Sequence, residues 1–395
     1  MTSGGQSDEQ TSIIVAAVLA TITTIFPGFL VGALSVQISE EFSVSEGTYG
    51  WGLGAFFLAA TISSIASGRL AQRVGPRRQV TGVLIVSASA QLGIAFIANS
   101  FATLIVFLSI AGLVNAANQS AINLLLSQAK LPRLGLAIAL KQSGMPTAAL
   151  LGGLAVPALA LTLGWRSAYV VGAIATLGAL VNVRRVIAPM GRIVREVPAP
   201  VTARRALVVA AIGFGFMAFA AGALNAWIVG SGVDAGLDEG VAGLLLSMGA
   251  AVGIAVRLMI GVRLDRSTRS PLRAAAGFSA VGAIGMALLA VQTPLMAVIA
   301  TIFAFGAGWV WPVFTNYGVV RANLSAAGSA SGVTQTGVYI GVFCGPLLTG
   351  ALIESSGYPT MWLVTSAAMF IGLTITALVS SQFAFEQSTE TSTVM

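Results

Sequence analysis

Long apolar runs recur along the whole chain, and only short polar segments separate them. A helix needs about 20 mostly apolar residues to cross the hydrocarbon core of a bilayer. Charged residues are only 8% of the 395 residues, against about 25% in a soluble domain. The sequence therefore predicts an all-α membrane protein with twelve transmembrane helices. The runs cover 12–37, 48–68, 79–98, 101–128, 134–162, 167–187, 207–229, 241–262, 274–291, 295–318, 327–352 and 360–381.

The longest polar stretch, 184–205, lies between the sixth and seventh runs and contains three prolines. We interpret it as the connection between two six-helix bundles. The polar, acidic N-terminus lacks the positive segment of a cleaved signal peptide, so the first run is expected to be a retained helix. The predicted organisation is a tail at 1–11, a bundle at 12–187, a linker at 188–206, a bundle at 207–381 and a tail at 382–395.

Several chemistries are excluded by composition. The chain has no histidine and a single cysteine, Cys344, which rules out histidine-based catalysis, disulfides within the chain and thiolate metal clusters. We expect no cofactor, no metal site and no enzymatic activity.

The basic residues lie mostly on one side of the membrane if the N-terminus is cytoplasmic. Seventeen of the 20 then fall in cytoplasmic segments, and Arg166 alone lies on the opposite side. Short loops with this bias orient a membrane protein, which predicts that both termini are cytoplasmic. Orientation thus explains the net charge of +7 without a nucleic-acid partner. The short tails and loops suggest a bacterial cytoplasmic (inner) membrane.

The two halves repeat at a constant offset of 193 residues. An ungapped register across six helices is hard to produce by chance. Parallel repeats related by an axis along the membrane normal are an architecture of secondary transporters. The matching pairs include Glu46 and Glu239, Asn123 and Asn316, Gly135 and Gly328, Gln142 and Gln335, and Gly164 and Gly357.

The segment 68–78 between the second and third runs joins glycines to an arginine-rich turn that can bind helix C-termini. With these residues the chain resembles the major facilitator superfamily over essentially its whole length. The resemblance implies twelve helices in two pseudo-symmetric bundles and a motif that latches the cytoplasmic gate. Gln72 departs from the family pattern, which has a carboxylate there, so the first latch is expected to be weaker. The matching residues are Gly68, Gln72 and Arg73, repeated as Gly261, Asp265 and Arg266.

The resemblance also implies that helices 1, 2, 4 and 5 and their counterparts 7, 8, 10 and 11 face a central path. The fourth run carries Asn115, Asn118, Gln119 and Asn123 on one helical face. Such a stripe either lines a wet cavity or bonds helices to one another, and the sequence leaves both readings open. Asn115 and Asn118 are the cavity candidates because they are nearer to the middle of the span.

Two cations, Lys141 and Arg257, fall inside predicted spans where charge is costly. Their long side chains could simply reach the interface. In the resembling fold, however, the fifth and eighth helices are neighbours, and two cations facing one cavity would bind an anion. Arg257 also precedes Gly261 by four residues. This spacing is similar to that of the oxalate/formate and monocarboxylate branches, where the arginine contacts the substrate carboxylate.

Further binding candidates are Trp309, Gln335 and Tyr339, which lie away from the predicted span ends and would form an apolar wall with polar anchors. Gly337, Gly341 and Gly345 are interpreted as close-packing positions.

The predicted function is a secondary active or facilitative transporter of a small organic anion, such as a carboxylate, by rocker-switch alternating access. The alternative is a multidrug or metabolite exporter of neutral apolar compounds, and a receptor or scaffold is a third class. Drug exporters usually need a carboxylate in the membrane, and spans 1, 4, 7, 10 and 11 contain none. The expected partners are the bilayer and the small-molecule substrate, with the protein a monomer.

Overall fold

In the computed structural model, the described part of the chain consists of helices and short connections, and no strand occurs there. The described residues are 3–128, 140–187, 204–264, 267, 269–323 and 327–383. The predicted linker at 188–206 therefore lies almost wholly outside them.

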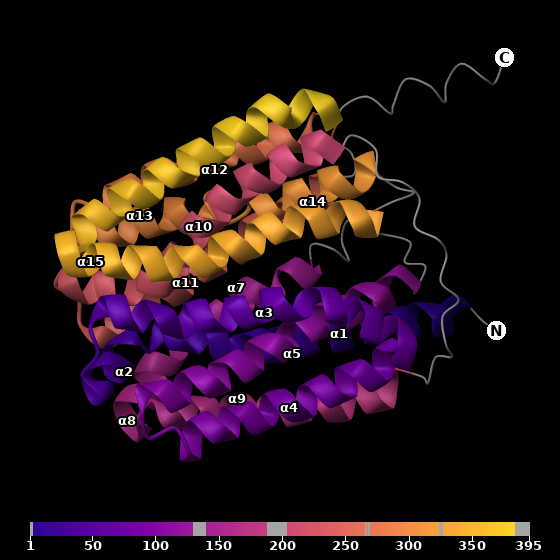
Figure 1. Ribbon diagram of the computed structural model, residues 1–395, viewed down its shortest axis with the longest axis horizontal. Coiled ribbons are helices and arrows are strands. Elements are labelled where there is room, and N and C mark those ends of the chain that lie inside the picture. The colour runs from indigo at the N-terminus through magenta and orange to yellow at the C-terminus, as the bar shows by residue number, and fades with distance from the viewer. Residues whose placement is uncertain are drawn as a thin grey trace.

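The long helices run side by side along the longest axis of the molecule (Figure 1). The first half contains α1 (Ser3–Ala33), α2 (Ser35–Phe42), α3 (Glu46–Val74), α4 (Pro76–Phe96), α5 (Phe101–Gln128), α7 (Gly144–Ala155), a π-helical turn (Val156–Ala160), α8 (Leu161–Leu163) and α9 (Arg166–Val186). The second half contains α10 (Arg204–Asp234), α11 (Glu239–Leu264), α12 (Pro271–Leu289), α13 (Pro294–Gly306), α14 (Trp311–Ala322), α15 (Ala327–Val379) and a 3-10 turn (Ser380–Phe383).

Ten stretches of the described chain are long and apolar enough to cross a membrane. The last of them, Ala330–Phe383, turns at Gly357, where φ is +74°, and so supplies two crossing arms. Helix α3, with 29 residues, adds a further crossing. The described residues thus hold the twelve crossings that the sequence predicts.

Two predicted runs are not single helices. The run 295–318 is divided into α13 and α14, because residues 307–310 leave the helix before Pro312 at the start of α14. Proline fixes its own φ and lacks the N–H that a helix interior needs, which favours a new helix start at this point. The run 12–37 is likewise divided, since Leu34 separates α1 from α2.

The 193-residue repeat of the sequence reappears in the helix boundaries. Two pairs of helices begin 193 residues apart and two pairs end 193 residues apart. Two pairs of residues with positive φ, which lie in the connections between helices, are also 193 residues apart. A parallel repeat with one register across each half accounts for all of these matches. The equivalent starts are Glu46 and Glu239, and Phe101 and Pro294; the ends are Phe96 and Leu289, and Val186 and Val379; the residues with positive φ are Ser43 and Gly236, and Gly164 and Gly357.

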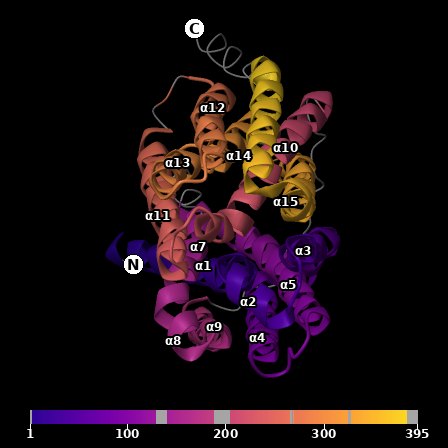
Figure 2. The same cartoon turned by 90° about the vertical axis from the view of Figure 1, so that its left-hand side faces the viewer.

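Helices α1, α3 and α7 of the first half pack against α10, α15 and α11 of the second half, respectively. Figure 2 shows the two groups one above the other, with α4 and α9 on the far side of the first. At three crossings the backbones meet so closely that a Cβ on a glycine would contact a carbonyl oxygen of the other half. These pairs are Gly32 and Asn225, Gly50 and Pro346, and Gly153 and Gly243.

The two ends of the bundle differ in charge. We call the basic end the one where α9 ends at Arg184, Arg185 and Val186 and where α10 begins at Arg204. All three glycine crossings lie toward the opposite end, where α2 meets α9. There Arg166 Nη1 pairs with Glu41 Oε1 at 2.6 Å. The two halves are therefore joined most tightly at the end away from the basic residues.

Candidate functional site

A cavity of about 150 Å³ lies between the two halves, from mid-bundle toward the basic end. Both halves supply its wall, chiefly α1, α3, α5 and α7 on one side and α10, α14 and α15 on the other. Its polar lining residues are Gln119, Asn123, Lys141, Gln142, Asn225, Thr315, Asn316, Thr334, Gln335 and Tyr339.

Lys141 is the one charged side chain among the described residues that line this cavity. Its ammonium nitrogen donates a hydrogen bond to Asn123 Oδ1 at 2.5 Å. An ammonium group has three donors, so further donor capacity is available to a solute. No carboxylate is present in the described lining to neutralise the charge.

The second half contributes a related polar pair to the same cavity. Gln335 Nε2 donates to Asn316 Oδ1 at 3.5 Å. Asn316 is the repeat equivalent of Asn123, and Gln335 is that of Gln142, the neighbour of Lys141. The two halves therefore present similar amide groups at equivalent positions, but only the first half adds a cation.

Aromatic rings form the apolar part of the wall. The break between α13 and α14 places Trp309 in the lining, with its ring centroid 5.8 Å from that of Phe29 in the other half. Trp311 packs against Phe214, with ring centroids 6.0 Å apart. Tyr339 lies on the lining from α15. The cavity thus combines a few polar anchors with aromatic surface, as small-molecule sites do.

Two buried donors on the lining lack a partner within the described protein: Gln119 Nε2 and Trp311 Nε1. Buried N–H groups are nearly always satisfied by protein, water or ligand. One buried acceptor on the lining, Asn225 Oδ1, also lacks a partner there, so the wall suits a cavity content that forms hydrogen bonds.

Arg257 does not line the cavity; it lies behind Trp309 with 1% of its surface exposed. Its Nη1 donates to the backbone carbonyl of Gln142 across the interface at 2.7 Å. Its Nη2 donates to the Trp309 carbonyl, and the guanidinium carbon lies 5.0 Å from the Trp309 ring centroid. In this conformation the arginine joins α11 to the residue beside Lys141.

Asn115 and Asn118 also lie off the cavity wall. They are 2% and 0% exposed. Asn115 Oδ1 accepts from Thr24 Oγ1 at 3.4 Å, and Asn118 Nδ2 donates to the same hydroxyl at 3.1 Å. Here the two asparagines tie α5 to α1, while the other members of the stripe, Gln119 and Asn123, line the cavity.

Lining residues that the sequence did not place among the binding candidates include Trp311, Asn225 and Asn316. The 193-residue repeat was the available signal for Asn316, because its equivalent Asn123 belongs to the polar stripe. No sequence pattern marked Asn225, whose side chain also bonds to its own helix at Ala221.

The proposed gating residues that the structure describes lie at the basic end. Gly68, Gln72 and the exposed Arg73 belong to the last turns of α3, and Gly261 is buried in α11. Asp265 and Arg266 lie outside the described residues. In the arginine-rich segment 68–78, Arg77 Nη2 donates to the Arg184 carbonyl at the end of α9, at 2.8 Å. An arginine of this turn thus binds a helix C-terminus, as the sequence suggests.

A family model described as Major Facilitator Superfamily matches residues 13–343 of the chain. The match covers most of the 395 residues: nearly all of the first half and the second half as far as residue 343. The chain belongs to the major facilitator superfamily. This facilitator is therefore a transporter of small solutes and not an enzyme. No curated protein matches the chain.

Membership agrees with the position of the cavity in this facilitator. The cavity lies between two parallel halves and is built from helices of both, which is where transporters with such repeats bind their solutes. The partners of the protein are a small-molecule substrate and the lipid bilayer.

Proposed function

We propose that this facilitator carries a small organic anion, such as a carboxylate, across the membrane by alternating access. Lys141 is the residue that contacts the anionic group. The observation that carries the proposal is the unneutralised ammonium group of Lys141 on the wall of a cavity shared by both halves. A cation in such a low-dielectric site attracts an anion far more strongly than it would in water.

The other groups of the wall fit a hydrogen-bonding solute with an apolar body. Gln119 Nε2 and Trp311 Nε1 are donors without a partner in the described protein. Trp309 and Tyr339 supply aromatic surface. A cavity near 150 Å³ accommodates a solute about as large as benzene, which corresponds to a small carboxylate.

Alternating access requires the two bundles, at 12–187 and 207–381, to rock about this site. The close glycine crossings Gly50–Pro346 and Gly153–Gly243 would separate when the end opposite the basic one opens. The bond from Arg257 to Gln142 would then change with the same motion. In the other conformation Arg257 becomes a second candidate for contact with the anion, with Gln335 as a neutral anchor.

Coupling follows from the residues on the wall. No Asp or Glu lies on the described cavity lining, so a proton has no acidic acceptor of the protein there. We therefore infer anion exchange, facilitated diffusion, or cotransport in which the bound anion itself carries the proton.

The test is ligand-induced stabilisation of the purified protein in detergent. A panel of small carboxylates is compared with a panel of neutral apolar compounds. At least one carboxylate should raise the melting temperature of the wild type but not that of Lys141→Gln. Arg263→Gln is the matched control, because it removes an exposed charge at the basic end of α11. Stabilisation by neutral compounds alone, unchanged in Lys141→Gln, would favour an exporter of apolar compounds.

A further inference from the structure

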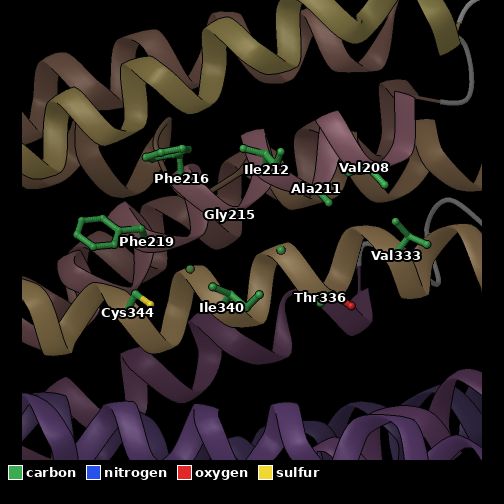
Figure 3. A pocket seen from close by; sticks show the side chains of 12 residues that line it. Val208, Ala211, Ile212, Gly215, Phe216, Phe219, Val333, Thr336, Ile340 and Cys344 are labelled. Carbon is green, nitrogen blue, oxygen red and sulfur yellow. The ribbon is translucent and has the colours of Figure 1, made fainter. Parts of the chain in front are cut away.

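A second hollow, of about 620 Å³, lies between α10 and the first arm of α15. Figure 3 shows side chains of both helices along it, from Val208 and Val333 toward the basic end to Phe219 and Cys344. We call it the α10–α15 groove. It is distinct from the central cavity, because the same two helices turn other residues, such as Phe214 and Val338, to the cavity.

The groove is shallow because the backbones of α10 and α15 are in contact along its floor. A Cβ on Gly337 would meet the Ala211 carbonyl oxygen, and one on Gly341 would meet that of Gly215. Larger side chains stand along the groove on the outer surface of the helices. Ile212 and Ile340 are 51% and 53% exposed, so the groove is open to the medium around these helices.

The described lining of the groove offers almost no hydrogen bonding. Its one hydroxyl, Thr336 Oγ1, donates to the carbonyl of Gly332 in its own helix at 3.0 Å. The remaining side-chain heteroatom of this lining is the sulfur of Cys344 (Figure 3), a weak hydrogen-bonding group. An occupant must therefore be apolar over the length of the groove.

The length of the groove fits one leaflet of a bilayer. Val208 and Phe219 are eleven residues apart on α10, which corresponds to about 16 Å at 1.5 Å per residue. Half of a typical hydrocarbon core is about 15 Å. The groove begins one turn inside the basic end of α10 and so runs from the membrane surface toward the midplane.

A positive charge stands at the outer end of the groove. Arg204 is exposed and precedes Val208 by four residues, which places both on the same face of α10. Ile212 and Phe216 continue this face along the groove. The α10–α15 groove therefore combines an apolar surface about as long as one acyl chain with a cation at the level of the lipid headgroups.

We propose that the α10–α15 groove binds one acyl chain of an anionic phospholipid from the leaflet at the basic end, with the headgroup phosphate beside Arg204. The charge favours an anionic over a zwitterionic headgroup, since each arginine near a membrane surface contributes roughly a fivefold preference. A neutral apolar solute would fill the groove without using Arg204.

The experiment is photolabelling of the full-length protein in nanodiscs. A phosphatidylglycerol and a phosphatidylcholine, each with a diazirine in the acyl chain, are compared with a diazirine alkane that has no headgroup. Labelled peptides are mapped by mass spectrometry. Ile212→Trp fills the groove, and Ile284→Trp is the matched control, because Ile284 on α12 is similarly exposed at 54%.

We expect phosphatidylglycerol to label the α10 and α15 groove peptides several-fold more than phosphatidylcholine. Ile212→Trp should reduce this labelling at least fivefold, whereas Ile284→Trp leaves it unchanged. Arg204→Gln should remove the preference for phosphatidylglycerol, and the exposed Arg185→Gln at the end of α9 should not. Equal labelling by the alkane, equal labelling by both lipids, or equal effects of the two tryptophan variants would overturn the proposal.

Discussion

The buried arginine between the halves gives the most quantitative prediction. In Arg257→Lys the charge stays but the planar fork is lost. The two carbonyls that Arg257 binds, on Gln142 and Trp309, are met by different terminal nitrogens of the guanidinium group. A single ammonium group on a shorter reach cannot replace both contacts. One charge-assisted hydrogen bond and the contact with the Trp309 ring are therefore lost.

The expected loss follows from these contacts. A hydrogen bond to a charged group contributes about 1.5–3 kcal/mol, and a desolvated cation–ring contact contributes roughly 0.5–2 kcal/mol. Arg257→Lys should therefore destabilise this conformation by about 2–5 kcal/mol. Arg263→Lys, at an exposed position six residues further along α11, should change the stability by about 0.5 kcal/mol or less.

Two assays divide this loss between unfolding and a change of conformation. Unfolding of the purified protein in SDS and detergent mixtures measures the stability. Spin labels at the exposed residues Leu151 on α7 and Met259 on α11, in a Cys344→Ser background, measure the distance between the two helices. We expect lower stability, a larger population with α7 and α11 apart, or both. An Arg257→Lys protein that matches Arg263→Lys in both assays would refute the reasoning.

Three further predictions concern the scaffold. Gly341→Ala should destabilise the protein by about 1–3 kcal/mol in thermal unfolding, because the new Cβ would press on the Gly215 carbonyl. Gly277→Ala is the control and should not destabilise it, because the space around Gly277 is open. Gly357→Ala should cost about 1–2 kcal/mol in the same assay, since φ is +74° there. Partial burial alone would raise the pKa of Glu41, but hydrogen bonds from Arg166 and Trp165 lower it below its ordinary value. The wild type should therefore be more stable than Glu41→Gln at neutral pH, by at most about 1 kcal/mol. This difference should vanish as the pH falls through the lowered pKa. An advantage that grew on acidification would contradict this assignment.

The arrangement of helices could be predicted from the sequence because it depends on patterns that are long and regular. Apolar runs fix where the chain crosses a bilayer, and a repeat of 193 residues leaves little freedom in the register of the halves. The left-handed turns at Gly164 and Gly357 follow from glycines that already match in the sequence. The glycines 337, 341 and 345 were likewise readable as close-packing positions, and all three abut α10.

The side-chain arrangement of the site was less predictable. Whether Asn118 or Gln119 lines a cavity depends on a rotation of about 100° about the helix axis. Both residues belong to the same polar stripe of α5, so residue type alone does not record that rotation. Arg257 binds backbone carbonyls, and such partners leave no trace in residue identity. The break that places Trp309 and Trp311 in the site arises within a continuous apolar run, so hydropathy alone does not reveal it.

The central claim is that Lys141 holds the anionic group of the transported solute. The most direct measurement is counterflow in proteoliposomes, in which vesicles loaded with a carboxylate that stabilises the purified protein take up the same compound in radiolabelled form. Wild type and Arg263→Gln should accumulate the label. Lys141→Gln should lose at least about thirtyfold in apparent affinity, because removing one partner of a desolvated charge pair costs about 2–5 kcal/mol and each 1.4 kcal/mol is about tenfold. Unchanged counterflow of the carboxylate by a folded Lys141→Gln protein would contradict the account.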